Sequence, residues 1–138
     1  MASDLSRFLD AQRYDYDTAL REIRSGRKRS HWMWYIFPQI QGLGFSSTAQ
    51  YYAIRDLQEA KDYLAHPVLG ARLKEISEAL LALDGLSAHE VFGYPDDLKL
   101  RSSMTLFSLA APEETVFSAV LEKYYGGEPD SRTIQLAR

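Results

Sequence analysis

The sequence contains no cysteine, which excludes thiol catalysis, disulfide bonds and zinc sites built from cysteine. Its amino terminus has no apolar run of the signal-peptide type, and no segment is long enough to cross a bilayer. We therefore expect a cytoplasmic protein without a membrane partner, and the missing cysteine is compatible with that compartment. No window alternates apolar and polar residues as a half-buried strand does, and no internal repeat is present.

The chain also lacks a strong charge of either sign. Its formal net charge is -3 and its pI is near 5.6, so a globally basic surface for nonspecific nucleic-acid binding is not expected. The three histidines, His31, His66 and His89, lie far apart and form no metal-binding pair, so we expect no metal site, and no motif indicates a cofactor.

What the chain does contain is helical periodicity over most of its length. The clearest stripe consists of Leu69, Leu73, Ile76, Leu80 and Leu83, which step by three or four residues. The 138 residues therefore predict an all-α fold, a compact single domain over residues 1–138 with a bundle of about seven to nine short helices. The predicted helices cover residues 4–13, 15–24, 31–36, 56–65, 67–83, 87–93, 95–110, 112–125 and 130–136.

Cap signals mark several of these helix ends. Asp56 and Asp130 are suitable amino-terminal caps, and Ser87 stands in capping-box register with Glu90. Ser30 is predicted to cap the short helix that ends before Pro38.

Four segments together resemble a known family. In chain order they read GRKRSHWMWYIFPQIQGLG, EAKDYLAHPVLGARL, KLRSSMTLFSLA and YYGGEPDSRTIQL. They resemble the domain of unknown function 1810 family of small proteins, and the resemblance extends from about Leu5 to Leu136. It implies a compact, mainly helical single domain, and it supplies no reaction, cofactor or catalytic residues.

The first candidate site is a basic loop between two predicted helices. Arg27, Lys28 and Arg29 would lie between the carboxyl end of one helix and the amino end of the next, where free backbone N–H groups can bind an anion. Ser30 and His31 add a hydroxyl and an imidazole, so the loop suits a phosphate or a carboxylate. The alternative is a solvated loop that only complements the helix dipoles.

The aromatic residues that follow have two interpretations. In the structural one, Trp32, Trp34 and Phe37 form the central packing. In the functional one, one tryptophan or Tyr35 stacks on a planar ligand beside the basic loop, and Gln39 lies near the same point. We favour the core for Met33, Trp34 and Phe37 and leave both interpretations open for Trp32 and Tyr35.

A second polar group lies on the predicted helix over residues 95–110. Lys99 is three and four residues from Ser102 and Ser103, so the three side chains share one face. Ser103 falls on the inward stripe, where a serine can simply bond the carbonyl one turn earlier. The alternative is a polar pocket, to which Asp130 could contribute.

Three functions from different classes remain open. The first is binding of a small phosphorylated or nucleotide-like ligand, and its expected contacts are Arg27, Lys28, Ser30, His31, Trp32, Tyr35, Gln39, Ser102 and Asp130. The second is an enzyme, a hydrolase or transferase with His31 as acid or base and Lys99 and Ser103 in the pocket. The third is an interaction or oligomerisation domain. We rank ligand binding first and expect a monomer or a small homo-oligomer.

Overall fold

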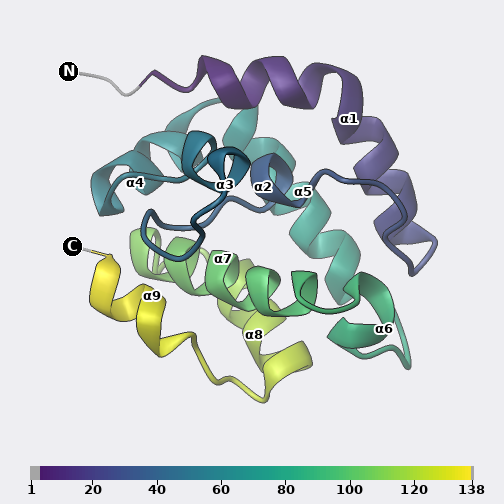
Figure 1. Cartoon of the computed structure of the whole chain (residues 1–138). Coiled ribbons are helices and arrows are strands. Elements are labelled where there is room, and N and C mark those ends of the chain that lie inside the picture. Colours follow the sequence, from purple (N-terminus) through teal and green to yellow (C-terminus); the bar gives the residue numbers. More distant parts are fainter. Residues whose placement is uncertain (1–3, 138) are drawn as a thin grey trace.

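The structure, a computed structural model, describes residues 4–137, and within this range the chain is helical with no β-strand (Figure 1). The all-α prediction is therefore confirmed. The helices are α1 (Ser6–Arg24), α2 (Met33–Ile36), α3 (Ser47–Tyr51), α4 (Leu57–Ala65), α5 (Leu69–Leu81), α6 (Ala88–Phe92), α7 (Asp96–Ala110), α8 (Thr115–Tyr125) and α9 (Ser131–Leu136). Among the described residues, no helix has the length and apolar character that spanning a membrane would require.

Helix α7 lies at the centre of the arrangement. It packs against α4, α6, α8 and α9, while α5 packs against α1, α4 and α8 (Figure 1). Phe107 of α7 contacts Tyr63 of α4 and Phe117 of α8, with ring centroids 5.4 and 5.9 Å apart. All three rings are fully buried, so the core lies around the inner face of α7.

Helix α1 is one continuous helix, where the sequence predicted two helices over residues 4–13 and 15–24. The prediction of a break was wrong because the buried residues Phe8, Gln12, Tyr16 and Ile23 keep helical spacing from end to end. The polar Gln12 conceals this stripe in the sequence. Its amide donates to the Tyr35 carbonyl oxygen at 2.7 Å and to the Tyr63 hydroxyl at 2.9 Å, which allows its burial.

Most of the predicted caps are confirmed. Asp56 accepts from Glu59 N at 2.8 Å, Ser87 and Glu90 form the capping box, and Asp130 accepts from Thr133 N at 3.0 Å. The prediction for Ser30 was wrong, since α2 begins at Met33 and has no side-chain cap.

The loop between α2 and α4 is closed by a small parallel bridge between Ile40 and Ile54. Gln41 N donates to the Ile54 carbonyl oxygen at 2.7 Å, and Ile54 N donates to the Gln39 carbonyl oxygen at 2.8 Å. Residues 42–53 therefore form a tied loop, which contains the unpredicted helix α3, capped by Ser46.

The segment between α1 and α2 is held by the side chain of Glu22. Its Oε1 accepts from Arg29 N at 2.8 Å, Ser30 N at 3.0 Å and Trp32 Nε1 at 2.8 Å, and its Oε2 accepts from Ser30 Oγ at 2.6 Å. Glu22 lies in the last turn of α1, so its side chain reaches the loop that leaves the helix. Partial burial of the carboxyl favours a higher pKa, but the hydrogen bonds from Ser30, Arg29 and Trp32 outweigh burial and lower the pKa of Glu22 to about 2.

The close approach of α4 and α5 generates the first prediction. A Cβ atom on Gly70 would lie 2.1 Å from the backbone oxygen of Leu64, so the two helices would have to move apart. We expect Gly70→Ala to lower the free energy of unfolding by at least about 2 kcal/mol, measured by urea denaturation. Helix propensity alone would make the Gly70→Ala protein more stable than the wild type. A variant that is as stable as the wild type, or more stable, would therefore contradict this packing.

The second prediction concerns the carboxylate of Glu22. Glu22→Gln should lower the free energy of unfolding at pH 7 by about 1.5–3 kcal/mol, because charged hydrogen bonds are replaced by neutral ones. Folding lowers the pKa of Glu22 from 4.5 to about 2. The difference in unfolding free energy between wild type and Glu22→Gln should therefore be fully present above pH 4.5 and decline as the pH falls toward 2. Denaturation curves of both proteins across this pH range would measure it.

Glu78→Gln is the matched control, because Glu78 is exposed on α5. Its effect should stay within about 0.5 kcal/mol at every pH. A difference between wild type and Glu22→Gln that does not change between pH 7 and pH 2.5 would show that the ionised carboxylate does not hold the loop.

Candidate functional site

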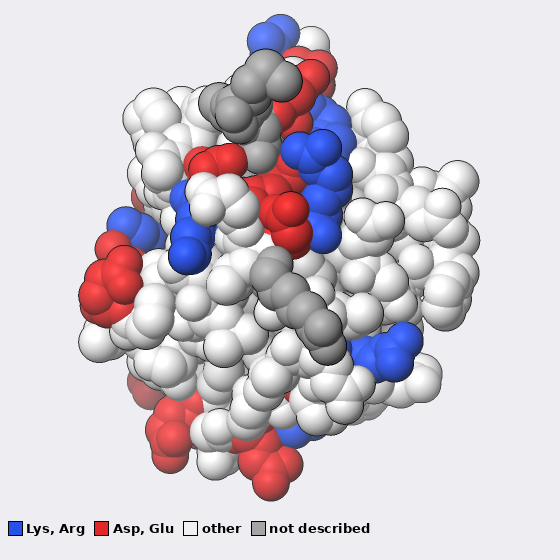
Figure 2. Space-filling view, turned by 90° about the vertical axis from the view of Figure 1, so that its left-hand side faces the viewer, with Lys and Arg blue, Asp and Glu red and all other residues white. Residues whose placement is uncertain are grey.

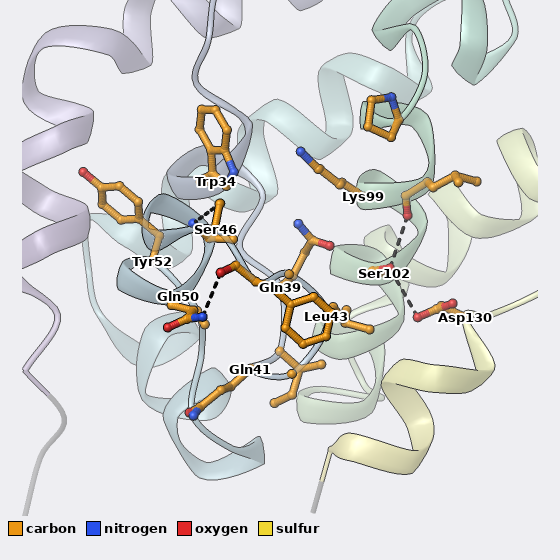
Figure 3. Close-up of a pocket in the computed structure, with 18 residues that line it drawn as sticks. Trp34, Gln39, Gln41, Leu43, Ser46, Gln50, Tyr52, Lys99, Ser102 and Asp130 are labelled. Carbon is orange, nitrogen blue, oxygen red and sulfur yellow. Dashed lines mark hydrogen bonds between the residues drawn. The ribbon is translucent and has the colours of Figure 1, made fainter.

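A cavity of about 480 Å³ lies between α2, the tied loop and the amino-terminal half of α7 (Figure 3). A volume of this size suits a small molecule. Its lining residues are Trp34, Gln39–Phe45, Ser46, Ala49, Gln50, Tyr52, Ala53, Pro95, Leu98, Lys99, Ser102 and Asp130. Four of the residues singled out in the sequence, Gln39, Lys99, Ser102 and Asp130, therefore share one cavity.

Trp34 and Lys99 face each other across the upper part of this cavity (Figure 3). Lys99 Nζ lies 5.2 Å from the centroid of the Trp34 ring, within the range of a cation–π contact. The same amino group lies 3.4 Å from Asp96 Oδ1, which is long for an ion pair, so the pairing is weak. An aromatic face and a cation therefore approach each other within the cavity.

The structure reverses the expected roles of the tryptophans. Trp34, predicted to be core, is half-buried and lines the cavity. Trp32 is 1% exposed, and its indole N–H is bound to Glu22. Tyr35 is buried as well, and its hydroxyl donates to Asp15 and lies 3.2 Å from the His31 carbonyl oxygen. Burial and the Asp15 carboxylate raise the pKa of Tyr35. Trp32 and Tyr35 are therefore core residues, and their prediction as ligand contacts is corrected.

Gln39 lies between Trp34 and Ser102 in the close-up view (Figure 3). Its backbone is fixed by the bridge to Ile54, but its half-buried side-chain amide makes no hydrogen bond with any other residue between 4 and 137. The amide can therefore offer both a donor and an acceptor to a molecule in the cavity.

Ser102 and Asp130 line the opposite side of the cavity. Ser102 Oγ lies 3.2 Å from both the Leu98 carbonyl oxygen and Asp130 Oδ2. Asp130 Oδ2 also accepts from the backbone and hydroxyl of Thr133, at 3.0 and 2.5 Å. Asp130 therefore caps α9 and borders the cavity at the same time.

The basic loop does not form the predicted anion site. The backbone amides of Arg29 and Ser30, and the Ser30 hydroxyl, are already bound by Glu22. Arg27 and His31 are exposed and do not line the cavity. The prediction failed because it treated the loop amides as open, whereas a carboxylate of the chain occupies the place expected for an external anion.

The side chain of Lys28 is buried. Its Nζ lies 2.8 Å from Asp96 Oδ2 and 2.6 Å from the Ser30 carbonyl oxygen, and 5.0 Å from the centroid of the Trp32 ring. Asp96 therefore lies between two lysines and is closer to Lys28 than to Lys99. The two groups of residues singled out in the sequence are linked through this aspartate.

The three residues of the enzyme hypothesis do not converge. Ser103 is fully buried, and its Oγ has no hydrogen-bond partner among the described residues and does not line the cavity. The serine that bonds the carbonyl one turn earlier is Ser102. His31 is exposed elsewhere, which leaves Lys99 alone in the cavity. Within residues 4–137, no group of three or more acidic or histidine side chains could hold a metal ion.

Sequence reasoning assigned Trp34 to the core and missed most of the tied loop as cavity residues. The one available signal in the loop was Ser46, a cap residue followed by five helical positions. Nothing in the local sequence distinguishes Trp34 from Trp32, because the difference depends on the reach of Glu22 from α1.

The crystal structure of the conserved hypothetical protein Rv1873 from Mycobacterium tuberculosis is similar, with 51% sequence identity and a TM-score of 0.95 over 97% of this chain and 96% of that one. No curated protein matches the chain. The family model described as "Protein of unknown function (DUF1810)" matches residues 2–137, and the chain therefore belongs to this family.

Proposed function

We propose that the protein binds a small planar ligand with one anionic group in the cavity between α2, the tied loop and α7. The observation that carries the proposal is the placement of Lys99 Nζ over the half-buried ring of Trp34, inside a cavity of about 480 Å³. A ring stacked on Trp34 would bring its anionic substituent within reach of Lys99.

The charge of Lys99 remains available for such a ligand. Its counter-ion Asp96 makes the shorter contact with Lys28, 2.8 Å against 3.4 Å, so a ligand carboxylate or phosphate could replace the weaker of the two pairs. The Lys99 side chain is 28% exposed, which permits access from the cavity while limiting solvent screening. The cytoplasmic location expected from the sequence stays a prediction, and it fits a soluble metabolite as the ligand.

Phenyl phosphate is a minimal probe, because it combines one ring with one anionic group. We expect wild-type protein to bind it in isothermal titration calorimetry, and Lys99→Gln and Trp34→Leu each to weaken binding about tenfold. Lys61→Gln removes the same charge from an exposed position on α4 and should leave the affinity unchanged. Equal affinities in the Lys99→Gln, Trp34→Leu and wild-type proteins would rule out this cavity as the binding site.

The interaction hypothesis keeps one specific observation in its favour. Phe45, on the tied loop, is 80% exposed, and Leu98, on α7, is 48% exposed, and both line the same cavity. Large apolar side chains that are exposed can bind a second protein surface.

Self-association through this surface is testable with one variant. If it occurs, light scattering should show a mass that rises with protein concentration for the wild type and stays monomeric for Phe45→Ser. A wild type that remains monomeric at every concentration, or a Phe45→Ser protein that associates equally well, would exclude self-association at Phe45.

A further inference from the structure

We infer that Gln39 recognises a ring edge with adjacent hydrogen-bond donor and acceptor atoms, so that the ligand is a nucleobase-type heterocycle carrying a single anionic group. This inference rests on the proposed function, because it concerns the same cavity. It goes further by assigning a chemical class to the ring and by excluding polyphosphate chains.

The position of Gln39 is fixed more firmly than that of an ordinary loop residue. Its carbonyl oxygen accepts from Ile54 N at 2.8 Å, the following residue Ile40 is 2% exposed, and Pro38 precedes it. The backbone is therefore held on both sides, and the side chain extends from a rigid support into the cavity (Figure 3). A recognition residue needs this kind of preorganisation.

The amide of Gln39 has unused hydrogen-bonding capacity in a partly desolvated place. No residue between 4 and 137 hydrogen-bonds to it, whereas the amide of Gln12 makes three hydrogen bonds and that of Gln50 bonds the Phe45 carbonyl oxygen at 2.9 Å. A half-buried amide is stabilised when a ligand supplies partners for its oxygen and its NH₂ group.

The geometry of an amide determines which partner suits it. One oxygen acceptor and one NH₂ donor side by side match a ligand edge that carries a donor next to an acceptor. Adenine, cytosine, uracil and guanine all present such edges, and a phenyl ring presents none. With the ring face on Trp34 and its edge at Gln39, both contacts come from neighbouring parts of one wall (Figure 3).

The charges around the cavity limit the ligand to one anionic group. Among the lining residues, Lys99 is the cation and Asp130 the anion. Behind Lys99, Asp96 is balanced by Lys28. The two lysines and two aspartates thus cancel, and a polyphosphate would find no cluster of cations.

The backbone amides that could bind phosphates are also occupied. Asp96 and Asp97 lie in the first turn of α7, and Asp97 Oδ1 accepts from Leu98 N at 2.9 Å. Glu22 binds the amides at residues 29 and 30. The face of the molecule in Figure 2 intermixes basic and acidic side chains and is otherwise largely uncharged. No phosphate-binding amide nest is left open at these two places.

The test compares ligands that differ only in the ring edge or in the number of phosphates. Calorimetry would use the 5′-monophosphates of adenosine, guanosine, cytidine and uridine, their triphosphates, and phenyl phosphate. We expect at least one monophosphate to bind about tenfold more tightly than phenyl phosphate, since a bidentate pair provides discrimination of this order. Each triphosphate should bind no more tightly than its monophosphate.

Two variants of Gln39 assign the effect to its amide. Gln39→Leu should reduce the ratio of the monophosphate affinity to the phenyl phosphate affinity to about one, because the edge contact is lost. Gln39→Glu offers two acceptors, so it should shift the preference toward guanosine monophosphate, whose base presents two adjacent donors, by about fivefold or more relative to the others. Gln58→Leu, at an exposed position on α4, is the matched control and should behave as wild type.

The possible failures are distinguishable. If phenyl phosphate binds through Lys99 and Trp34 as tightly as every monophosphate, or if Gln39→Leu keeps the monophosphate advantage, the inference is wrong and the proposed function stands. A triphosphate that binds more tightly than its monophosphate overturns the limit of one anionic group. If neither phenyl phosphate nor any nucleotide binds in a manner that depends on Lys99 and Trp34, the proposed function fails and the inference fails with it.

Discussion

The carboxylate of Glu22 holds the chain between α1 and α2, and the position of the cavity depends on this contact. Three N–H groups and one hydroxyl converge on the two oxygens, which binds the loop to the last turn of α1 and pulls the Trp32 indole inward. The stabilisation resembles that of an anion bound at open backbone amides, except that the anion belongs to the chain. With Trp32 fixed in the core, the four-residue helix α2 presents Trp34 to the cavity instead.

A second chain of contacts connects this loop to α7. Lys28 bonds Ser30 and Asp96, and Asp96 in turn approaches Lys99, so the loop, the first turn of α7 and the cavity cation are coupled through one aspartate. Each lysine also lies over a tryptophan ring, Lys28 over Trp32 and Lys99 over Trp34. The first pair is buried and structural, and the second opens into the cavity. The same combination of a cation, a ring and a shared acid therefore packs in the core at one position and lines the cavity of the proposed binding site at the other.

Much of the fold could be predicted from the sequence because it depends on local chemistry. The caps at Asp56, Ser87 and Asp130 follow from hydrogen bonds within a single turn, and the stripe on α5 follows from helical spacing. The break predicted in α1 was wrong because Gln12 is buried through bonds to Tyr35 and Tyr63, which are distant in sequence.

The site was predictable only in part, for a related reason. Gln39, Lys99, Ser102 and Asp130 were singled out for separate reasons, and the structure places all four in the lining of one cavity. Their role as ligand contacts stays a prediction. The prediction of an anion site at residues 27–31 was wrong. The backbone amides of Arg29 and Ser30 are bound by Glu22, which precedes them by seven and eight residues. Pairing of this kind is decided by the direction in which the chain leaves α1, and the spacing of residues does not encode that direction.

A crystal structure of the protein grown with one of the nucleoside 5′-monophosphates would show directly whether and where the cavity binds a ligand. The account predicts unbiased difference density for the base against the Trp34 ring, with its edge at the Gln39 amide and its phosphate near Lys99 Nζ, while Glu22 keeps its bonds to Arg29 and Ser30. Density for the nucleotide at residues 27–31, with Glu22 displaced from the loop amides, would contradict the account.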